Sequence, residues 1–338
     1  MREWWAAFRR SPYFPATVLV LILAAGAGAF AGSYTYAMAA PAPHHIPVAV
    51  VGASHETAQG KAFTLGLERA MAASLDLRYL ATRADAMRAI ERQQVYAAVF
   101  VRGQTIEMDV SSASGASVAQ LLTEQAPKVA ARAGRPLTIR DVKPLQHADP
   151  RGLALFYITV AAVVIGYTGA AQLSRNAAGL EAGERIAFTV AYAALGAFAI
   201  VAIVDWILGA LRLPVLESWF ILTLTMFTSG MVFTMFNTFM GRWSLVPTWA
   251  LMVLLGNPSS GGAVAWPLLP SPLSFIGRWL PPGASVNAQH TAVYFPGHQS
   301  ATPFLVLGAW ALTSCAVFWA WRHRHPGGRP EETASGPG

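Results

Sequence analysis

The sequence predicts an α-helical polytopic membrane protein of six spans, with an α/β domain between spans 1 and 2. Hydrophobic residues make up 54% of the chain and charged residues only 12%, about half the charged fraction of an average soluble domain. The charge is also uneven, because residues 41–151 hold 13 of the 24 Lys and Arg residues and 10 of the 17 acidic residues. The rest of the chain contains apolar runs long enough to cross a bilayer, which takes about 20 residues.

Six apolar runs account for the predicted spans. They occupy residues 15–40, 152–173, 186–208, 218–240, 244–256 and 302–322. The first run is longer than the core of a cleavable signal, about 7–15 residues, so we expect an uncleaved signal anchor. The fifth run is short for a span, and residues 262–282 are then interrupted by Pro267, Pro270 and Pro272. We expect a re-entrant or interfacial hairpin there, because proline-broken backbone is tolerated at membrane depth where it packs on protein.

The distribution of arginine predicts the orientation. With the N-terminus inside, the short inner segments carry nine arginines and the short outer segments two, which follows the positive-inside rule. The inner set is Arg2, Arg9, Arg10, Arg175, Arg185, Arg242, Arg322, Arg324 and Arg329; the outer set is Arg212 and Arg278. We therefore expect a multi-pass protein of the bacterial cytoplasmic membrane with both termini cytoplasmic. On this interpretation, the net charge of +7 comes largely from arginines that set the membrane topology. We therefore expect no nucleic-acid partner.

This orientation divides the chain into four parts. Residues 1–40 form the cytoplasmic N-terminus and first span, 41–150 the extracytoplasmic α/β domain, 151–322 a five-span bundle, and 323–338 a disordered cytoplasmic tail. In the domain we predict strands at 46–54, 75–82, 95–103, 105–113 and 137–145, and helices at 55–75, 83–94 and 116–134, because hydrophobic periodicity alternates between these segments. The single cysteine, Cys315, lies in an apolar run, so the domain must fold without an intrachain disulfide.

The domain offers no credible catalytic or metal site. Gly60-Lys61 follows Gly52 at the wrong spacing for a phosphate loop. His44, His45 and His55 are the metal-binding alternative, but two of them are adjacent in a proline-rich linker. The pair Ser54-His55 lacks an orienting acid nearby. The sequence thus predicts a protein that is not an enzyme and has neither a metal nor a cofactor.

Two polar residues lie within predicted spans. Asp205 is near the outer end of the third span, and an ionisable residue inside a span is a functional candidate by default. Its place near the interface favours the alternative, a carboxylate hydrated at little cost. Asn237 in the fourth span is either a functional group or, more commonly, a hydrogen-bonding contact to a neighbouring helix.

Residues 254–295 carry a resemblance to a known family. The run Gly-Asn-Pro-Ser-Ser-Gly-Gly (256–262) and the sequence Leu-Pro-Pro-Gly (280–283) resemble the signature region of bacterial YhgE/Pip-like membrane proteins of the type-2 ABC exporter permease superfamily. The resemblance implies a broken outer hairpin at about 256–283 that closes a translocation path. The implied outer gate consists of Gly256, Asn257, Pro258, Gly261 and Gly262. It also implies that residues 174–185 meet an ATPase subunit, with Arg175, Glu181, Glu184 and Arg185 as charged contacts.

The resemblance leads to the function expected from the sequence. We expect the permease subunit of an ABC-type exporter, a homodimer or heterodimer that moves an apolar or amphipathic compound outward. Because the chain has no Gly-x-x-x-x-Gly-Lys-Ser/Thr motif, a separate ATP-binding subunit must supply the energy. The alternative is a non-transporting envelope protein whose outer domain binds a partner or serves as a surface receptor.

Overall fold

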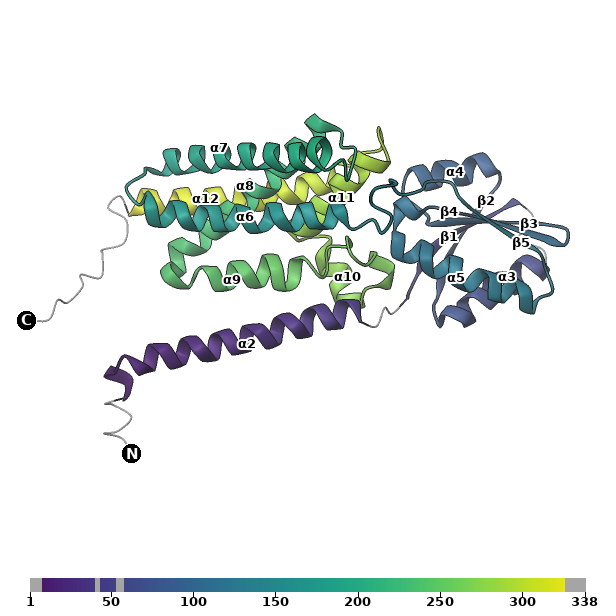
Figure 1. The fold of residues 1–338 in the computed structure, drawn as a ribbon, viewed down its shortest axis with the longest axis horizontal. Coiled ribbons are helices and arrows are strands. Elements are labelled where there is room, and N and C mark those ends of the chain that lie inside the picture. The colour runs from purple at the N-terminus through teal and green to yellow at the C-terminus, as the bar shows by residue number, and fades with distance from the viewer. Residues whose placement is uncertain (1–7, 40–42, 53–57, 326–338) are drawn as a thin grey trace, which may run out of the picture.

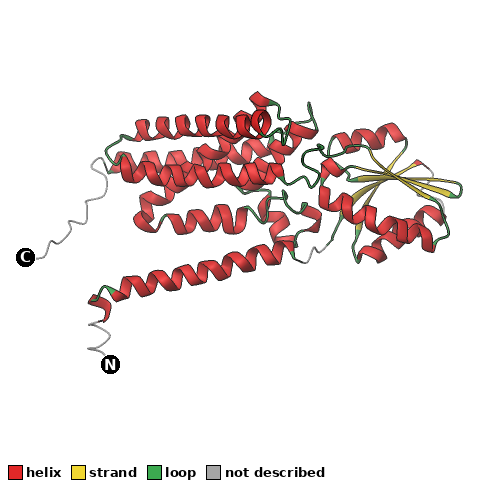
Figure 2. Ribbon diagram, viewed as in Figure 1, coloured by secondary structure: helices red, strands yellow, loops and turns green. Residues whose placement is uncertain are grey.

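The computed structural model describes residues 8–39, 43–52 and 58–325, which form a bundle of helices with an α/β domain at one end (Figures 1 and 2). The described chain begins and ends at the opposite end of the bundle, remote from the sheet (Figure 1). Residues 1–7, 40–42, 53–57 and 326–338 are not described. The Ser54-His55 pair, which the sequence did not favour as a catalytic pair, lies outside the described residues, as do Arg2, Arg329 and most of the expected tail.

The domain contains a five-stranded mixed sheet, as the periodicity predicted. Its strands are β1 (Ile46–Val51), β2 (Leu75–Leu80), β3 (Ala97–Arg102), β4 (Thr105–Val110) and β5 (Leu137–Asp141). They lie in the order β2-β1-β3-β4-β5, and only the β3–β4 pair is antiparallel. The register pairs Ile46 with Leu75 and Val48 with Ala97. This order places the hairpin β3–β4 in the middle of the sheet and β2 and β5 at its edges.

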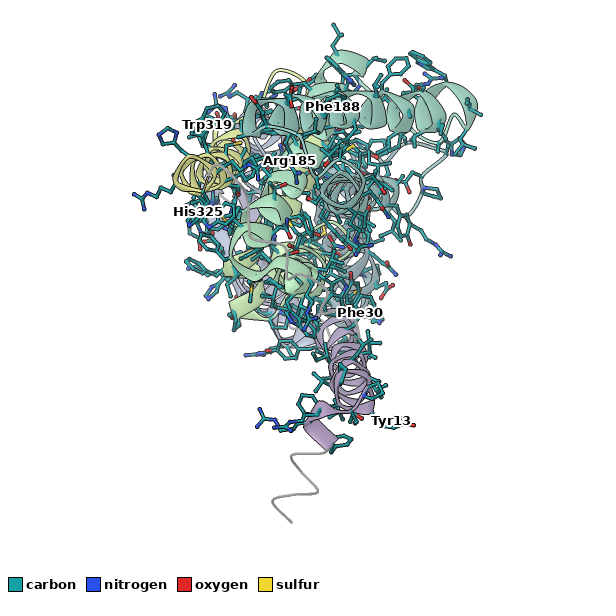
Figure 3. All side chains as sticks on the ribbon, turned by 90° about the vertical axis from the view of Figure 1, so that its left-hand side faces the viewer. Tyr13, Phe30, Arg185, Phe188, Trp319 and His325 are labelled. Carbon is teal, nitrogen blue, oxygen red and sulfur yellow. The ribbon has the colours of Figure 1, made fainter. Side chains whose placement is uncertain are left out.

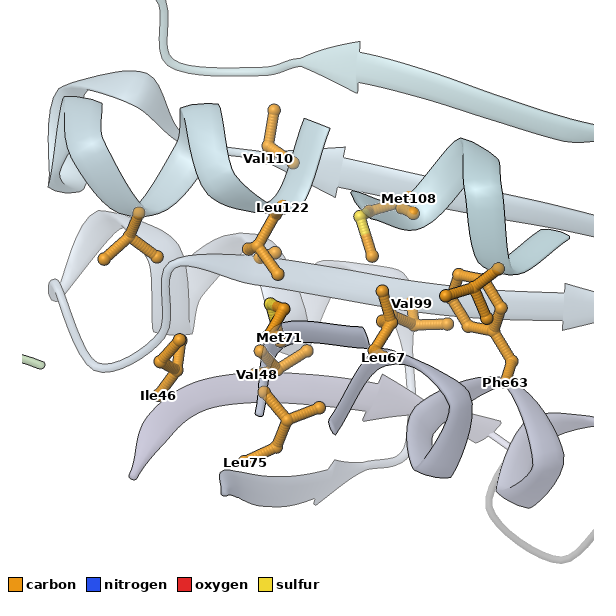
Figure 4. Packing of buried hydrophobic residues seen from close by; sticks show 14 of the residues in the cluster. Ile46, Val48, Phe63, Leu67, Met71, Leu75, Val99, Met108, Val110 and Leu122 are labelled. Atoms are coloured by element: carbon orange, nitrogen blue, oxygen red, sulfur yellow. The ribbon is translucent and has the colours of Figure 1, made fainter. Parts of the chain in front are cut away.

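Helices cover both faces of this sheet. The helices α3 (Ala58–Met71) and α5 (Ala116–Arg132) contact each other and bury Phe63, Leu67 and Leu122 against the strands (Figure 4). The third helix, α4 (Arg83–Glu91), packs Ile90 on a second apolar cluster. Its start is fixed by a capping box, because Thr82 accepts from the Asp85 backbone N–H and Asp85 accepts from the Thr82 backbone N–H. Each face therefore has its own core.

The bundle has five helices that are long and apolar enough to cross a membrane. They are α2 (Tyr13–Met38), α6 (Ala154–Asn176), α7 (Ala182–Val201) with its π-helical continuation to Ile207, α8 (Val215–Met240) and α12 (Thr302–Arg324). Helix α8 contacts α6, α7 and α12 and is the most buried of the five. The fifth predicted run forms a shorter apolar helix, α9 (Leu245–Trp249) with a π-helical extension, Ala250–Gly256. A helix-rich fold with five candidate membrane spans among the described residues is thereby confirmed, whereas a sixth full span stays a prediction.

A broken hairpin follows this short helix, and it extends further than the sequence indicated. It contains a 3-10 turn (Trp266–Leu268), α10 (Ser271–Gly277) and the additional helix α11 (Pro281–Tyr294), which is buried along almost its whole length. Helix α11 contains several polar residues although it is buried, so its sequence does not read as an apolar run. Its polar side chains bond to α8: Gln289 donates to the Ser218 carbonyl at 2.9 Å, and the Ser285 and Thr225 hydroxyls are 2.7 Å apart.

Residues 263–269, here called the docking segment, attach the two parts of the molecule to each other. Ala265 and Leu268 belong to the α/β core beside Leu122 and Val118, and Leu269 packs on Ala37 of α2. The Ala265 N–H donates to the Ser117 hydroxyl at 3.0 Å. The segment thus enters the hydrophobic core of one part while remaining covalently part of the other.

We expect the change Leu268→Ala to destabilise this junction. The side chain is 2% exposed, so truncation removes buried apolar surface at a cost of about 2–5 kcal/mol. Thermal unfolding of the purified protein in a neutral detergent should show a lower Tm. The control is Leu65→Ala on α3, whose side chain is 49% exposed. If both changes lower the Tm equally, the docking segment does not contribute to the core.

Candidate functional site

A cavity lies where the α/β domain meets the bundle. Its volume is about 610 Å³, within the range of small-molecule sites, about 300–1,000 Å³. The α/β domain contributes β1, β2 and the start of α5; the bundle contributes the start of α6, the glycine-rich run, α10 and α11. Neither part encloses this space alone, so the docking segment determines its shape.

Positive charge and hydroxyl groups dominate the cavity wall. Arg78 of β2, Arg151 before α6 and Arg278 after α10 line it, and none of its described lining residues is Asp or Glu. Arg278 lies 5.0 Å from the centre of the Trp266 ring, and Arg78 Nε is 3.6 Å from Asp76 Oδ2. Desolvation raises the pKa of Tyr96 to about 12, although the nearby Arg278 acts in the opposite direction. At neutral pH, Tyr96 is therefore a neutral neighbour of these cations.

The glycine-rich run 256–262 forms the bundle side of this site. Of the predicted gate residues, Gly261 and Gly262 line the cavity, while Gly256, Asn257 and Pro258 are buried beneath it. Gly261 has φ +82°, and a Cβ there would lie 2.8 Å from the Trp266 ring. Both observations require glycine at this position. Two of the five predicted gate residues therefore lie at the cavity, and their role as a gate stays a prediction.

The run packs against the hairpin backbone to backbone. A Cβ on Gly277 would lie 1.8 Å from the Ser259 carbonyl oxygen, and one on Gly283 would lie 2.0 Å from the Gly277 carbonyl oxygen. A Cβ on Gly256 would lie 2.6 Å from the Pro282 ring. These contacts leave no room for side chains, so the floor is a closely packed plug and not a loose loop.

The predicted coupling loop lies at the other end of the bundle. The turn 177–181 joins α6 to α7 without a helix of its own. Glu181 and Glu184 form a capping box at the start of α7, in which the Glu181 N–H donates to Glu184 Oε2 at 2.9 Å. Their side chains and that of Arg175 are exposed. Three of the four predicted contact residues are thus accessible.

The fourth predicted contact residue, Arg185, points inward. It is buried and donates to the Ser174 hydroxyl at 2.9 Å and to the Ala177 carbonyl at 3.2 Å. Figure 3 looks onto this end and shows Arg185 within the bundle, whereas Trp319 lies on its outside. Arg185 therefore holds the turn in place from within.

The two intramembrane polar candidates lie apart from the cavity. Asp205 is partly exposed in the π-helical segment Ala202–Ile207, at the sheet end of α7. Asn237 accepts a hydrogen bond from the Ser244 hydroxyl at 3.4 Å, which links the end of α8 to the start of α9. Neither residue lines the described cavity.

No pattern in the sequence indicated the cavity arginines as a group. Their positions are far apart in the chain, and only the docking of the two parts brings them together. His44 and His45 also line the cavity, and His55 lies outside the described residues. No group of three His, Cys, Asp or Glu side chains with metal-binding geometry occurs in the described ranges.

We expect Gly277→Ala to force the floor apart. The added methyl group would collide with the Ser259 carbonyl, which is backbone and cannot rotate away, so overpacking should cost about 1–3 kcal/mol or more. The matched control is Gly308→Ala on α12, where nothing lies within 4 Å of the new Cβ. Thermal unfolding should show a lower Tm for Gly277→Ala alone. Equal Tm values for both variants would contradict the close packing.

Comparison with known proteins adds no relative. No protein-family model, curated protein or solved structure matches this chain. The resemblance to the YhgE/Pip-like permeases therefore stays a prediction from the residues 254–295, and the functional argument depends on the geometry of the site.

Proposed function

We propose that the chain is the permease subunit of an ABC-type exporter that moves an amphipathic compound outward, energised by a separate ATPase. The observation that carries this proposal is the single helix α6, which is continuous between the cavity and the exposed turn. Leu155 in its first turn lines the cavity, and Ser174 in its last turn accepts the hydrogen bond from Arg185. A displacement of the turn would therefore be transmitted along one rigid helix to the cavity wall.

The packing of α6 supports this role. Helix α6 contacts the buried α8, and a Cβ on Gly166 of α6 would lie 2.6 Å from the Met226 carbonyl of α8. The Tyr192 hydroxyl of α7 donates to the Gly166 carbonyl at 2.6 Å. Three helices therefore meet closely halfway along α6, so they would move together.

The proposed topology has six passes, with the α/β domain outside the cytoplasm and both termini inside, in a bacterial cytoplasmic membrane. The described chain starts and ends at the same end of the bundle, opposite the sheet (Figure 1), which an even number of passes requires. Residues 245–256 would make the sixth pass; as a helix they extend only about 18 Å of a ~30 Å hydrocarbon core. The 3-10 turn Gly241–Trp243 precedes them.

We also propose that a second permease chain, identical or homologous, packs on the exposed helices. Helix α2 lies at the edge of the bundle, where Phe30 stacks on Trp249 and the Ser33 hydroxyl donates to the Leu254 carbonyl, and the most hydrophobic part of α2 has no residue buried within the described chain (Figures 1 and 3). Lipid or a partner helix must cover such a surface.

The ATPase-coupling proposal is tested with substitutions that keep the helix cap. In Glu181→Gln/Glu184→Gln, the amide oxygens still accept the backbone hydrogen bonds of the capping box, but two negative charges are lost. We expect the double variant, reconstituted with a partner ATPase that the wild-type protein stimulates, to lose most of this stimulation of ATP hydrolysis. The matched control is Glu124→Gln on α5, an exposed acid of the α/β domain.

The outcome separates transport from the alternative, a surface receptor. The cavity lies at the junction and not inside the bundle, a position that also suits a receptor that binds its ligand outside. If the wild-type protein stimulates ATP hydrolysis and the double variant does not, the result supports a permease. If the double variant stimulates hydrolysis as the wild type does, the turn is not a coupling element.

A further inference from the structure

We propose that the junction cavity binds an anionic group, a phosphate or carboxylate, at the head of an amphipathic compound. The amphipathic part of this statement rests on the proposed function; the anionic part rests on the cavity itself. Arg78, Arg151 and Arg278 reach it from three separate segments, and no acidic residue in the described lining neutralises them. All three side chains are exposed, so the cavity wall presents positive charge to the accessible space between the two parts.

Two of these arginines lack a carboxylate partner. Arg151 and Arg278 form no ion pair with any described residue, whereas Arg78 has Asp76 at 3.6 Å. Two acids of the domain are occupied elsewhere: Asp149 accepts from the Leu153 and Ala154 N–H groups, and Glu91 pairs with Lys143 at 2.9 Å. Arginine side chains without a partner suit a bidentate contact with a phosphate or carboxylate.

A serine hydroxyl on the cavity wall supports the same assignment. The Ser274 side chain of α10 lines the cavity, is 9% exposed, and has no hydrogen-bond partner among the residues that the structure describes. Its oxygen is not among the fully buried polar atoms, so it is accessible from the cavity and can donate to a ligand. A bound anion would supply that partner.

The α/β domain adds favourable backbone charge from the opposite side. Gly115, Ala116 and Ser117, at the start of the 17-residue helix α5, line the cavity. The N-terminus of a helix carries partial positive charge and backbone N–H groups that favour anions. Together with Ser274 and the arginines of the bundle, it would hold an anion between the two parts of the protein.

The position of the cavity indicates where the rest of the ligand lies. Its floor is the glycine-rich run and its walls include α10, whose Phe275 is 69% exposed. The neighbouring Trp279 is 57% exposed. Aromatic side chains of this kind are enriched at membrane interfaces. An apolar tail could therefore extend along the hairpin into the bilayer while the head group stays at the arginines.

The test is a binding measurement on the full-length protein in a neutral detergent, without any ATPase. The probes for isothermal titration are inorganic phosphate, dioctanoyl phosphatidic acid and dioctanoylglycerol, which lacks the phosphate. We expect phosphatidic acid to bind and dioctanoylglycerol to bind at least about tenfold more weakly. Phosphate binding would identify a soluble anion as sufficient; binding of phosphatidic acid alone would identify a lipid-type head group.

Two sets of variants locate the site. Arg151→Gln/Arg278→Gln should raise the Kd for the anionic probe at least about tenfold, while Lys128→Gln/Arg132→Gln, which removes the same charge from the far end of α5, should leave it unchanged. Ser274→Ala, a small change that preserves folding, should weaken binding severalfold.

Absence of binding by both anionic probes, or equal effects of the two double variants, would overturn the proposal. Because no ATPase is present, this result is independent of the coupling experiment.

Discussion

The burial of the docking segment in the α/β core is the interaction on which the rest of the structure depends. Ala265 and Leu268 belong to the helix bundle by their position in the chain, but their side chains are buried in the core of the α/β domain. Burying Leu268 contributes roughly 2 kcal/mol of hydrophobic free energy. The bond between the Ala265 N–H and Ser117 also fixes the segment at the start of α5. Without this anchor, the side-chain contacts around it would have to hold the two parts together.

Other contacts surround the anchor and hold the domain in one orientation. Gln93 donates to the Thr291 hydroxyl of α11 at 2.8 Å. Gln146 and Arg212 exchange two hydrogen bonds, of 3.0 and 2.7 Å, between the domain linker and the segment after α7. Lys143 lies 5.4 Å from the centre of the Phe295 ring. These contacts come from three sides, so rotation of the domain would break several of them at once. The cavity between the two parts is consequently a defined site.

The sequence predicted those parts of the fold that local chemistry determines. The β-branched run at 46–51 and the long apolar runs of α6, α7, α8 and α12 needed no tertiary information. Helix α11 was missed because its polar residues are satisfied by α8, and that partner is 71 residues away in the case of Gln289 and Ser218. The capping box of Glu181 and Glu184 was detectable from its spacing, although glutamate is an unusual residue at the first position. The inward direction of Arg185 was not detectable, since it depends on Ser174 and Ala177.

The cavity illustrates the same limit. Arg278 was assigned to topology, as a residue flanking the membrane, and Arg151 was counted with the charge of the α/β domain. Their second possible role appears only when the docking segment brings β2, the start of α6 and the end of α10 to one place. The predicted gate residues were found as a motif, but their function as a floor follows from the close contacts of Gly277 and Gly283. The glycine-rich motif, the arginine charges and the close glycine packing thus all occur at this cavity. None of the three alone describes the site.

The central claim is that the α/β domain and the bundle form one body around this cavity. The most direct measurement is a distance distribution between spin labels at Lys128→Cys in α5 and Ala187→Cys in α7, with Cys315→Ser, in lipid and without an ATPase. One narrow distance is the predicted result. A broad distribution, or two distances of comparable population, would show that the domain moves freely on the bundle and would contradict the account.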